Sequence, residues 1–203
     1  MPITLEEYIK FVKTLESKAP PIPTNIEPNL HWGRLVHAAL GLTTEGLELY
    51  ESKSKGVPAQ LAELGDICYF AALAIDELGQ TTIPCETPAN LDNLLILIEA
   101  FGSRIKSGLF YETLEKSTDQ YPWRMLPARI FLMAQELGKR GGHDVLEINM
   151  KKLETRYRDK VFKKVDATSK RDTVTEDKVI AQAAAKPTFV QYDPKRGRTI
   201  LGD

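Results

Sequence analysis

Apolar residues recur along most of this chain at steps of three and four, the spacing that places them on one face of an α-helix. The first such stripe runs from Leu5 to Leu15, with Thr4 as its predicted N-cap. The same spacing predicts further helices over about 30–55, 59–78, 91–114, 124–138 and 144–163, and a short one near 175–185. Alternation typical of a half-buried strand is present only weakly, near 188–193. The pattern therefore predicts an all-α fold, a helical bundle.

The last part of the chain differs in composition from the rest. Residues 165–203 are rich in Lys, Asp and Thr, and then in Ala. We therefore expect residues 1–164 to form one domain and residues 165–203 to form a C-terminal arm or tail. Binding to nucleic acid is not expected, because the basic KRGR cluster in this tail is small enough to be a solvated patch.

The net charge and the cysteine content limit the binding partners and the cellular compartment that we expect for this chain. The net charge is −1, so no overall field attracts the chain to nucleic acid or to a membrane surface. No apolar run approaches the roughly 18 residues of a membrane helix, and the N-terminal residues do not read as a secretory signal. Cys68 and Cys85 have no metal-binding spacing, and Cys68 is expected to be a buried thiol. These features predict a cytoplasmic protein.

Two pairs of acidic residues stand inside apolar helical sequence. Glu45 and Glu48 are three residues apart, as are Glu63 and Asp66, so each pair projects from one face of its helix. A short turn at residues 56–58 favours antiparallel packing, which brings both pairs to a similar height. One such pair usually lies on the solvated surface of a helix. Carboxylates that border a core, however, raise the free energy of the folded state unless they are paired or bind a metal. A divalent cation removes their mutual repulsion, and oxygen-only ligands favour Mg²⁺ or Mn²⁺.

Histidine placement excludes one other carboxylate-rich bundle. Ferritin-like di-iron proteins place a Glu three residues before a His. None of the three histidines, His31, His37 and His143, has a Glu at that position. A di-iron oxidase is therefore not expected.

Two motifs carry a resemblance to a known family. EGLE at 45–48, a spacer over 49–62 and ELGD at 63–66 match an ExxE–spacer–ExxD pattern, and EINMKKLETRYRDKVF at 147–162 matches a closing helix. In these motifs the chain resembles the MazG-like all-α nucleoside triphosphate pyrophosphohydrolases, especially phage-type members, in the superfamily that includes dimeric dUTPases. The chain departs from the fuller motif at Thr44, where the family often has another acid.

The resemblance implies an enzyme that hydrolyses a (deoxy)nucleoside triphosphate to the monophosphate and pyrophosphate with Mg²⁺, or Mn²⁺, as cofactor. Its role would be control of a nucleotide pool, in the host cytoplasm if the chain is phage-encoded. The implied metal ligands are Glu45, Glu48, Glu63 and Asp66. Glu45 and Glu48 are the catalytic candidates, with Glu48 favoured as the base. Two alternatives stay open, a pyrimidine-specific dUTPase or dCTPase and a non-enzymatic bundle that binds a partner protein.

Cationic residues on the closing helix are candidates for phosphate binding. Asn149, Lys152 and Arg156 fall at steps of three and four and so share a helix face. Lys152 and Arg156 suit phosphate oxygens, and Asn149 suits phosphate or sugar. A solvated basic face explains the same spacing, and the family resemblance favours phosphate contact.

Three residues near the start of the metal-bearing helix are candidates for the base pocket, namely His31, Trp32 and His37. Helix capping and core packing explain each of them equally well.

The two central helices carry more apolar surface than one hairpin covers. Proteins that this chain resembles commonly pair their bundles. We therefore expect a homo-oligomer, a dimer or a tetramer, with the tail contributing to its contacts.

Overall fold

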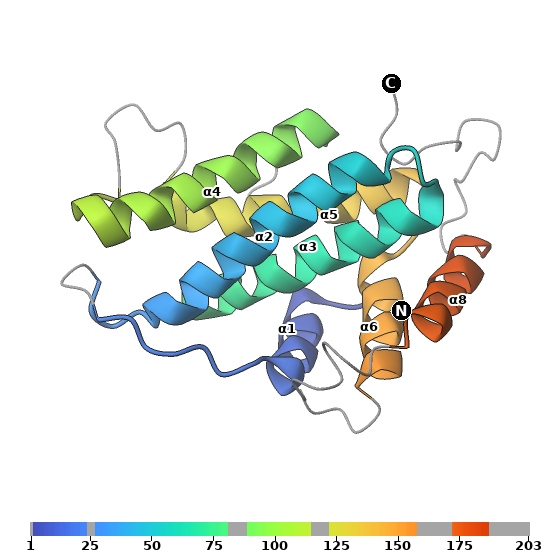
Figure 1. Cartoon of the computed structure of the whole chain (residues 1–203), viewed down its shortest axis with the longest axis horizontal. Helices are drawn as coiled ribbons and strands as arrows, with labels where there is room; N and C mark the ends of the chain where they lie inside the picture. Colours follow the sequence, from blue (N-terminus) through green and yellow to red (C-terminus); the bar gives the residue numbers. More distant parts are fainter. Residues whose placement is uncertain (1, 24–26, 81–88, 115–121, 158–171, 187–203) are drawn as a thin grey trace.

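The computed structural model describes residues 2–23, 27–80, 89–114, 122–157 and 172–186. Over these ranges the chain has seven α-helices, one short 3₁₀ helix and no strand (Figure 1), so the predicted all-α fold is confirmed. The elements are α1 (Leu5–Leu15), α2 (Trp32–Ser52), α3 (Val57–Glu77), α4 (Leu91–Tyr111), η1 (Trp123–Met125), α5 (Leu126–Arg140), α6 (Val145–Arg156) and α8 (Thr173–Ala184). The KRGR cluster, Cys85, the weak alternation near 188–193 and residues 158–163 of the predicted 144–163 helix lie outside the described residues. Within them, α6 ends at Arg156 with Tyr157 as its C-cap, so this helix ends earlier than predicted.

Capping side chains determine where several helices begin. Thr4 accepts a hydrogen bond from the backbone N–H of Glu7, and the Glu7 side chain accepts one from the Thr4 backbone N–H, which completes a capping box. Asn90, Asp144 and Asp172 begin α4, α6 and α8, and each side chain accepts from a backbone N–H of the first turn. The predicted N-cap at Thr4 is therefore confirmed.

Four helices form a closed bundle, and α3 is its most enclosed member. Contacts between α2 and α3, α3 and α5, α5 and α4, and α4 and α2 complete the ring. On its other side α3 contacts α1, α6 and α8, which lie together below the bundle in Figure 1. The sequence of α3 explains this position, because the apolar stretch from Ile67 to Ile75 leaves few polar residues to face water. Cys68 lies in this stretch and is a fully buried free thiol, as predicted.

The α2–α3 hairpin is fixed at both ends. At the turn, Gly56 has φ of 92°, a left-handed value that favours glycine, and Pro58 occupies the first turn of α3. At the open end, the Arg34 guanidinium of α2 binds Asp76 at 2.6 Å and Glu77 at 3.4 Å, both from α3. These constraints set the register in which the acidic residues of the two helices face each other.

The described part of the tail packs on the body of the same chain. Helix α8 contacts α6 and α3, and its buried residues are Glu176 and Ile180. Its bounds agree with the short helix that was predicted near 175–185. Among the described helices, none is both long enough and apolar enough to cross a membrane.

Candidate active site

Three glutamates from the α2–α3 hairpin meet at one point. Carboxylate oxygens of Glu45, Glu48 and Glu63 all lie within 4.8 Å of one another. Glu45 and Glu63 are partly buried, and Glu48 is exposed. A hard cation with oxygen ligands at about 2.0–2.6 Å separates opposite ligands by roughly 4–5 Å, so the three side chains fit such an ion. The predicted meeting of the acidic pairs is therefore observed for these three members.

Burial and mutual repulsion raise the pKa of two of these carboxyl groups. Burial, and then the charges of Asp66, Glu63 and Glu48, raise the pKa of Glu45 to about 9, against a lowering effect of Lys152. Burial and the charge of Asp66 also raise the pKa of Glu63, while Lys152 and a hydrogen bond with Glu45 lower it. Near neutral pH, Glu45 therefore stays protonated unless a cation compensates its charge.

Asp66 is held by the closing helix rather than grouped with the three glutamates. Its Oδ1 accepts a hydrogen bond of 2.8 Å from Asn149 Nδ2, and its Oδ2 accepts one from Lys152 Nζ. The side chains of Lys152 and Asp66 are 3% and 17% exposed, so this ion pair is largely shielded from water. Asn149 and Lys152, which were predicted to bind phosphate, thus bind Asp66, which was predicted to be a metal ligand.

A buried tyrosine orients this contact from the first helix. Tyr8 Oη donates to Asn149 Oδ1 at 2.7 Å, which leaves Asn149 Nδ2 free to donate to the Asp66 carboxylate. The helices approach closely here, since a Cβ on Gly65 would lie 2.8 Å from Asn149 Cβ. Glycine at position 65 is therefore what lets α6 reach Asp66. Sequence reasoning did not identify Tyr8 as part of the site, because its spacing marks it only as a core residue of α1.

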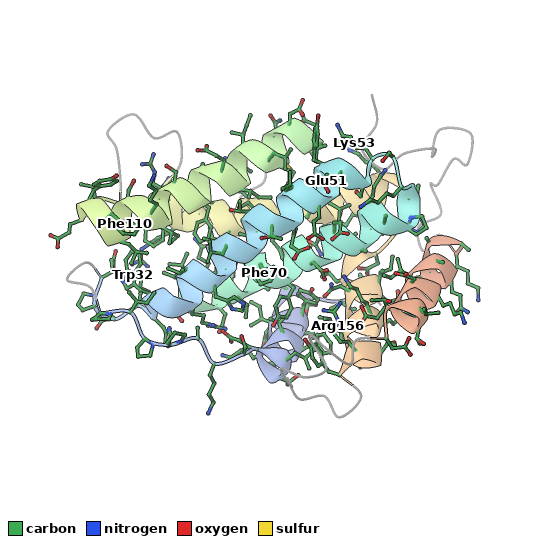
Figure 2. All side chains as sticks on the ribbon, viewed as in Figure 1. Trp32, Glu51, Lys53, Phe70, Phe110 and Arg156 are labelled. Carbon is green, nitrogen blue, oxygen red and sulfur yellow. The ribbon has the colours of Figure 1, made fainter. Side chains whose placement is uncertain are left out.

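The third predicted phosphate-binding residue is paired with the tail helix. Arg156 Nε and Nη2 donate to the two carboxylate oxygens of Glu176 at 2.9 and 2.7 Å. Figure 2 shows Arg156 on the side of the molecule where α6 and α8 lie. The Glu176 side chain is 2% exposed and that of Arg156 is 13% exposed. The sequence carried no signal for this pair, because no motif marks Glu176 within the short helix predicted near 175–185.

A cavity of about 520 Å³ brings these groups together. All four predicted metal ligands line it, with Lys55, Lys152 and Arg156 as cationic groups. The tail helix completes the wall with Glu176, Asp177, Ile180 and Ala181. Its volume lies within the range of about 300–1,000 Å³ that is usual for small-molecule sites.

A smaller cavity of about 190 Å³ adjoins the first and has aromatic walls. The two share Glu45, Asp66 and Arg156, and the aromatic residues of the smaller one are Tyr69, Phe70 and Tyr157. His37 also lines it, with its ring 5.5 Å from that of Phe70 in an edge-on contact. Burial lowers the pKa of His37, and its buried Nδ1 has no hydrogen-bond partner among the described residues. Of the three candidates for the base pocket, His37 is therefore the one that lies beside the acidic cluster.

His31 and Trp32 lie at the far end of α2. Trp32 and Glu51 mark opposite ends of this helix in Figure 2, and neither His31 nor Trp32 lines the two cavities. His31 is the N-cap of α2, where its Nδ1 accepts from the backbone N–H of Arg34 at 3.1 Å. Trp32 is buried in the core against Gly108. The structure thus gives these two residues capping and packing roles.

Comparison of the chain with protein-family models, with curated proteins and with solved structures finds no match. The function must therefore be inferred from the geometry of the site together with the motif resemblance.

The raised pKa of Glu45 predicts how stability depends on pH without metal. Its carboxyl group binds a proton up to about pH 9 when folded, against an ordinary value of 4.5. The contribution of this protonated carboxyl group to the free energy of unfolding is fully present below about pH 4.5. This contribution is lost as the pH rises to about 9. In EDTA at pH 8.5, Glu45→Gln should raise the free energy of unfolding by about 1–3 kcal/mol, since one pKa unit is worth about 1.4 kcal/mol and the cluster titrates jointly.

Denaturant unfolding between pH 5 and pH 9 measures this effect. Glu51→Gln is the matched control, because Glu51 is an exposed glutamate on α2 outside the cluster. A Glu45→Gln protein no more stable than wild type at pH 8.5 would contradict the electrostatic description.

Proposed function

We propose that this chain is a Mg²⁺-dependent nucleoside triphosphate pyrophosphohydrolase of the MazG-like kind. It would hydrolyse a (deoxy)nucleoside triphosphate to the monophosphate and pyrophosphate, and so control a nucleotide pool. The cation would be held by Glu45, Glu48 and Glu63, with Mn²⁺ able to replace Mg²⁺. When bound, the cation would polarise the phosphate oxygens and lower the pKa of an attacking water.

The observation that carries the proposal is the convergence of three glutamates from two antiparallel helices, within 4.8 Å, in a cavity that also has cationic walls. A triphosphate is strongly anionic near neutral pH. It therefore approaches carboxylates only when cations compensate the negative charges of both the triphosphate and the carboxylates. A bundle that merely binds a partner protein needs no such convergence, which makes the non-enzymatic alternative the weaker one.

Side chains of the protein supply the remaining catalytic and positioning roles. We assign the general base to Glu48, because it is the exposed member of the three and is thus within reach of water. Glu45 is the more enclosed catalytic candidate, and its raised pKa suits it to a ligand that ionises when the cation binds. Asn149 and Lys152 position Asp66 at the wall of the cavity, next to the three glutamates.

The smaller cavity is the proposed site for the base. Its aromatic side chains provide a stacking surface, and His37 Nδ1 offers a polar group without a hydrogen-bond partner in the described part of the chain. At about 190 Å³ it is below the usual range for drug-sized ligands. The aromatic walls suit stacking of either a one-ring or a two-ring base, and the motif resemblance keeps a pyrimidine-specific dUTPase or dCTPase as the second candidate function.

We also propose that the chain forms a homo-oligomer, at least a dimer. Large apolar side chains are exposed on neighbouring helices of the bundle, and the set comprises Leu40, Leu47 and Tyr50 on α2 and Ile96 and Phe110 on α4. A groove of about 460 Å³ between these two helices is lined in part by Leu47 and Tyr50. Large exposed apolar side chains beside such a groove are typical of protein–protein interfaces, and a second copy would cover them.

Product analysis tests the enzymatic proposal. With Mg²⁺ and each of the eight canonical nucleotides plus dUTP, the protein should release monophosphate and pyrophosphate from its preferred substrate. Glu48→Gln should lower kcat by roughly 10²-fold or more through loss of the base, whereas Glu51→Gln should stay near wild type. Diphosphate with orthophosphate, or a Glu48→Gln protein of nearly full activity, would refute the assignment.

Light scattering tests the assembly. The wild-type protein should have at least twice the chain mass of 22.8 kDa. Leu47→Asp should shift it toward the monomer, whereas Val174→Asp should not, since Val174 is equally exposed but lies on α8. A chain ended after Lys164 tests whether the tail contributes. A wild-type species at the chain mass would overturn the proposal.

A further inference from the structure

Arg156 in this structure binds a carboxylate in the geometry by which arginine binds phosphate. Its Nε and Nη2 each donate to a different oxygen of Glu176, at 2.9 and 2.7 Å. Planar guanidinium groups form the same two parallel hydrogen bonds with carboxylate and with phosphate. Glu176 therefore occupies the donor face of Arg156 that a phosphate would use.

The pair also stands at the wall of the acidic cavity. Arg156 and Glu176 both line it, beside Asp66 and Lys152. Lys152 is itself engaged by Asp66, so the two cations of α6 nearest the glutamates are each bound to a carboxylate of the chain. A phosphate that enters the cavity must therefore compete with Glu176 for Arg156.

The helix that carries Glu176 has two buried side chains, and Ala183 and Ala184 pack against the core as partly buried residues. Over α8, the buried residues are Glu176 and Ile180, while Val174 and Asp177 are exposed. Helices with few buried contacts open at low free-energy cost. The side chains of Arg156 and Glu176 are 13% and 2% exposed, so separation of this pair would disrupt one of the two buried contacts of α8, which favours release of the helix.

We propose that Glu176 is an internal substitute for a substrate phosphate, and that a polyphosphate chain displaces it from Arg156 and loosens α8 from the body. The inference rests on the proposed function and adds the regulation of that site. Glu176 of α8 then competes with polyphosphate for Arg156. The apparent affinity for polyphosphate therefore depends on the fraction of molecules in which Arg156 is released from Glu176.

Calorimetric titration of the full chain with inorganic triphosphate and Mg²⁺ tests the competition without requiring hydrolysis. Glu176→Gln keeps the shape of the side chain and removes its charge, and it should bind triphosphate at least about fivefold more tightly than wild type. Glu51→Gln makes the same change at an exposed glutamate of α2 that does not line the cavity, and it should change the affinity by less than about twofold. Equal effects of the two substitutions would mean a general charge effect and would overturn the proposal, as would weaker binding by Glu176→Gln.

Hydrogen exchange of the wild-type chain gives a second reading that does not depend on how a variant folds. Saturating triphosphate and Mg²⁺ should speed amide exchange over α8 and leave α4 unchanged. Slower or unchanged exchange over α8 would refute the displacement. Absence of triphosphate binding by every protein would also refute it, whereas absence of nucleotide hydrolysis with intact triphosphate binding would refute the enzymatic proposal alone.

Discussion

Repulsion among carboxylates on the α2–α3 hairpin is the constraint on which the rest of the site depends. Three glutamate side chains share a space in which their oxygens lie within 4.8 Å, and partial burial raises the pKa of Glu45 and Glu63. A chain selected for stability alone would not keep them there, since like charges at this distance oppose folding. The hairpin tolerates the cluster because a turn at Gly56 and an ion-pair network around Arg34 fix both of its ends.

The cationic side chains of α6 beside this cluster are bound to other carboxylates of the chain. Lys152 binds Asp66 and lowers the pKa of both Glu45 and Glu63 through its charge. Arg156, one turn further along, is bound by Glu176 of α8. The structure therefore compensates charge locally, with each cation already assigned to a carboxylate. On the proposed function, a metal ion would compensate the three glutamates, and the phosphates of a nucleotide would replace carboxylates as partners of the α6 cations.

The helices and the meeting of the glutamates were predictable from the sequence, whereas the partners of Asp66 and Arg156 were not. Spacing predicts that Glu63 and Asp66 share a helix face, and a short turn predicts that they meet the α2 pair. Spacing does not determine how a helix rotates about its axis, and that rotation directs Asp66 toward α6. The contact from Tyr8 to Asn149 joins residues 141 positions apart, so it depends on the packing of α1 and α6 against α3. Glu176 lies in a segment without a motif, so its pairing follows only from the docking of α8.

Direct titration with Mn²⁺, followed by electron paramagnetic resonance, tests the central claim that this cluster is a cation site. The wild-type chain at pH 7.5 should bind Mn²⁺ in a saturable manner, and added Mg²⁺ should compete. Glu63→Gln should weaken binding strongly, because it removes one of the three converging carboxylates, while Glu51→Gln should bind as the wild type does. Saturable binding that is equal in wild type and Glu63→Gln, or no binding by the wild type, would contradict the account.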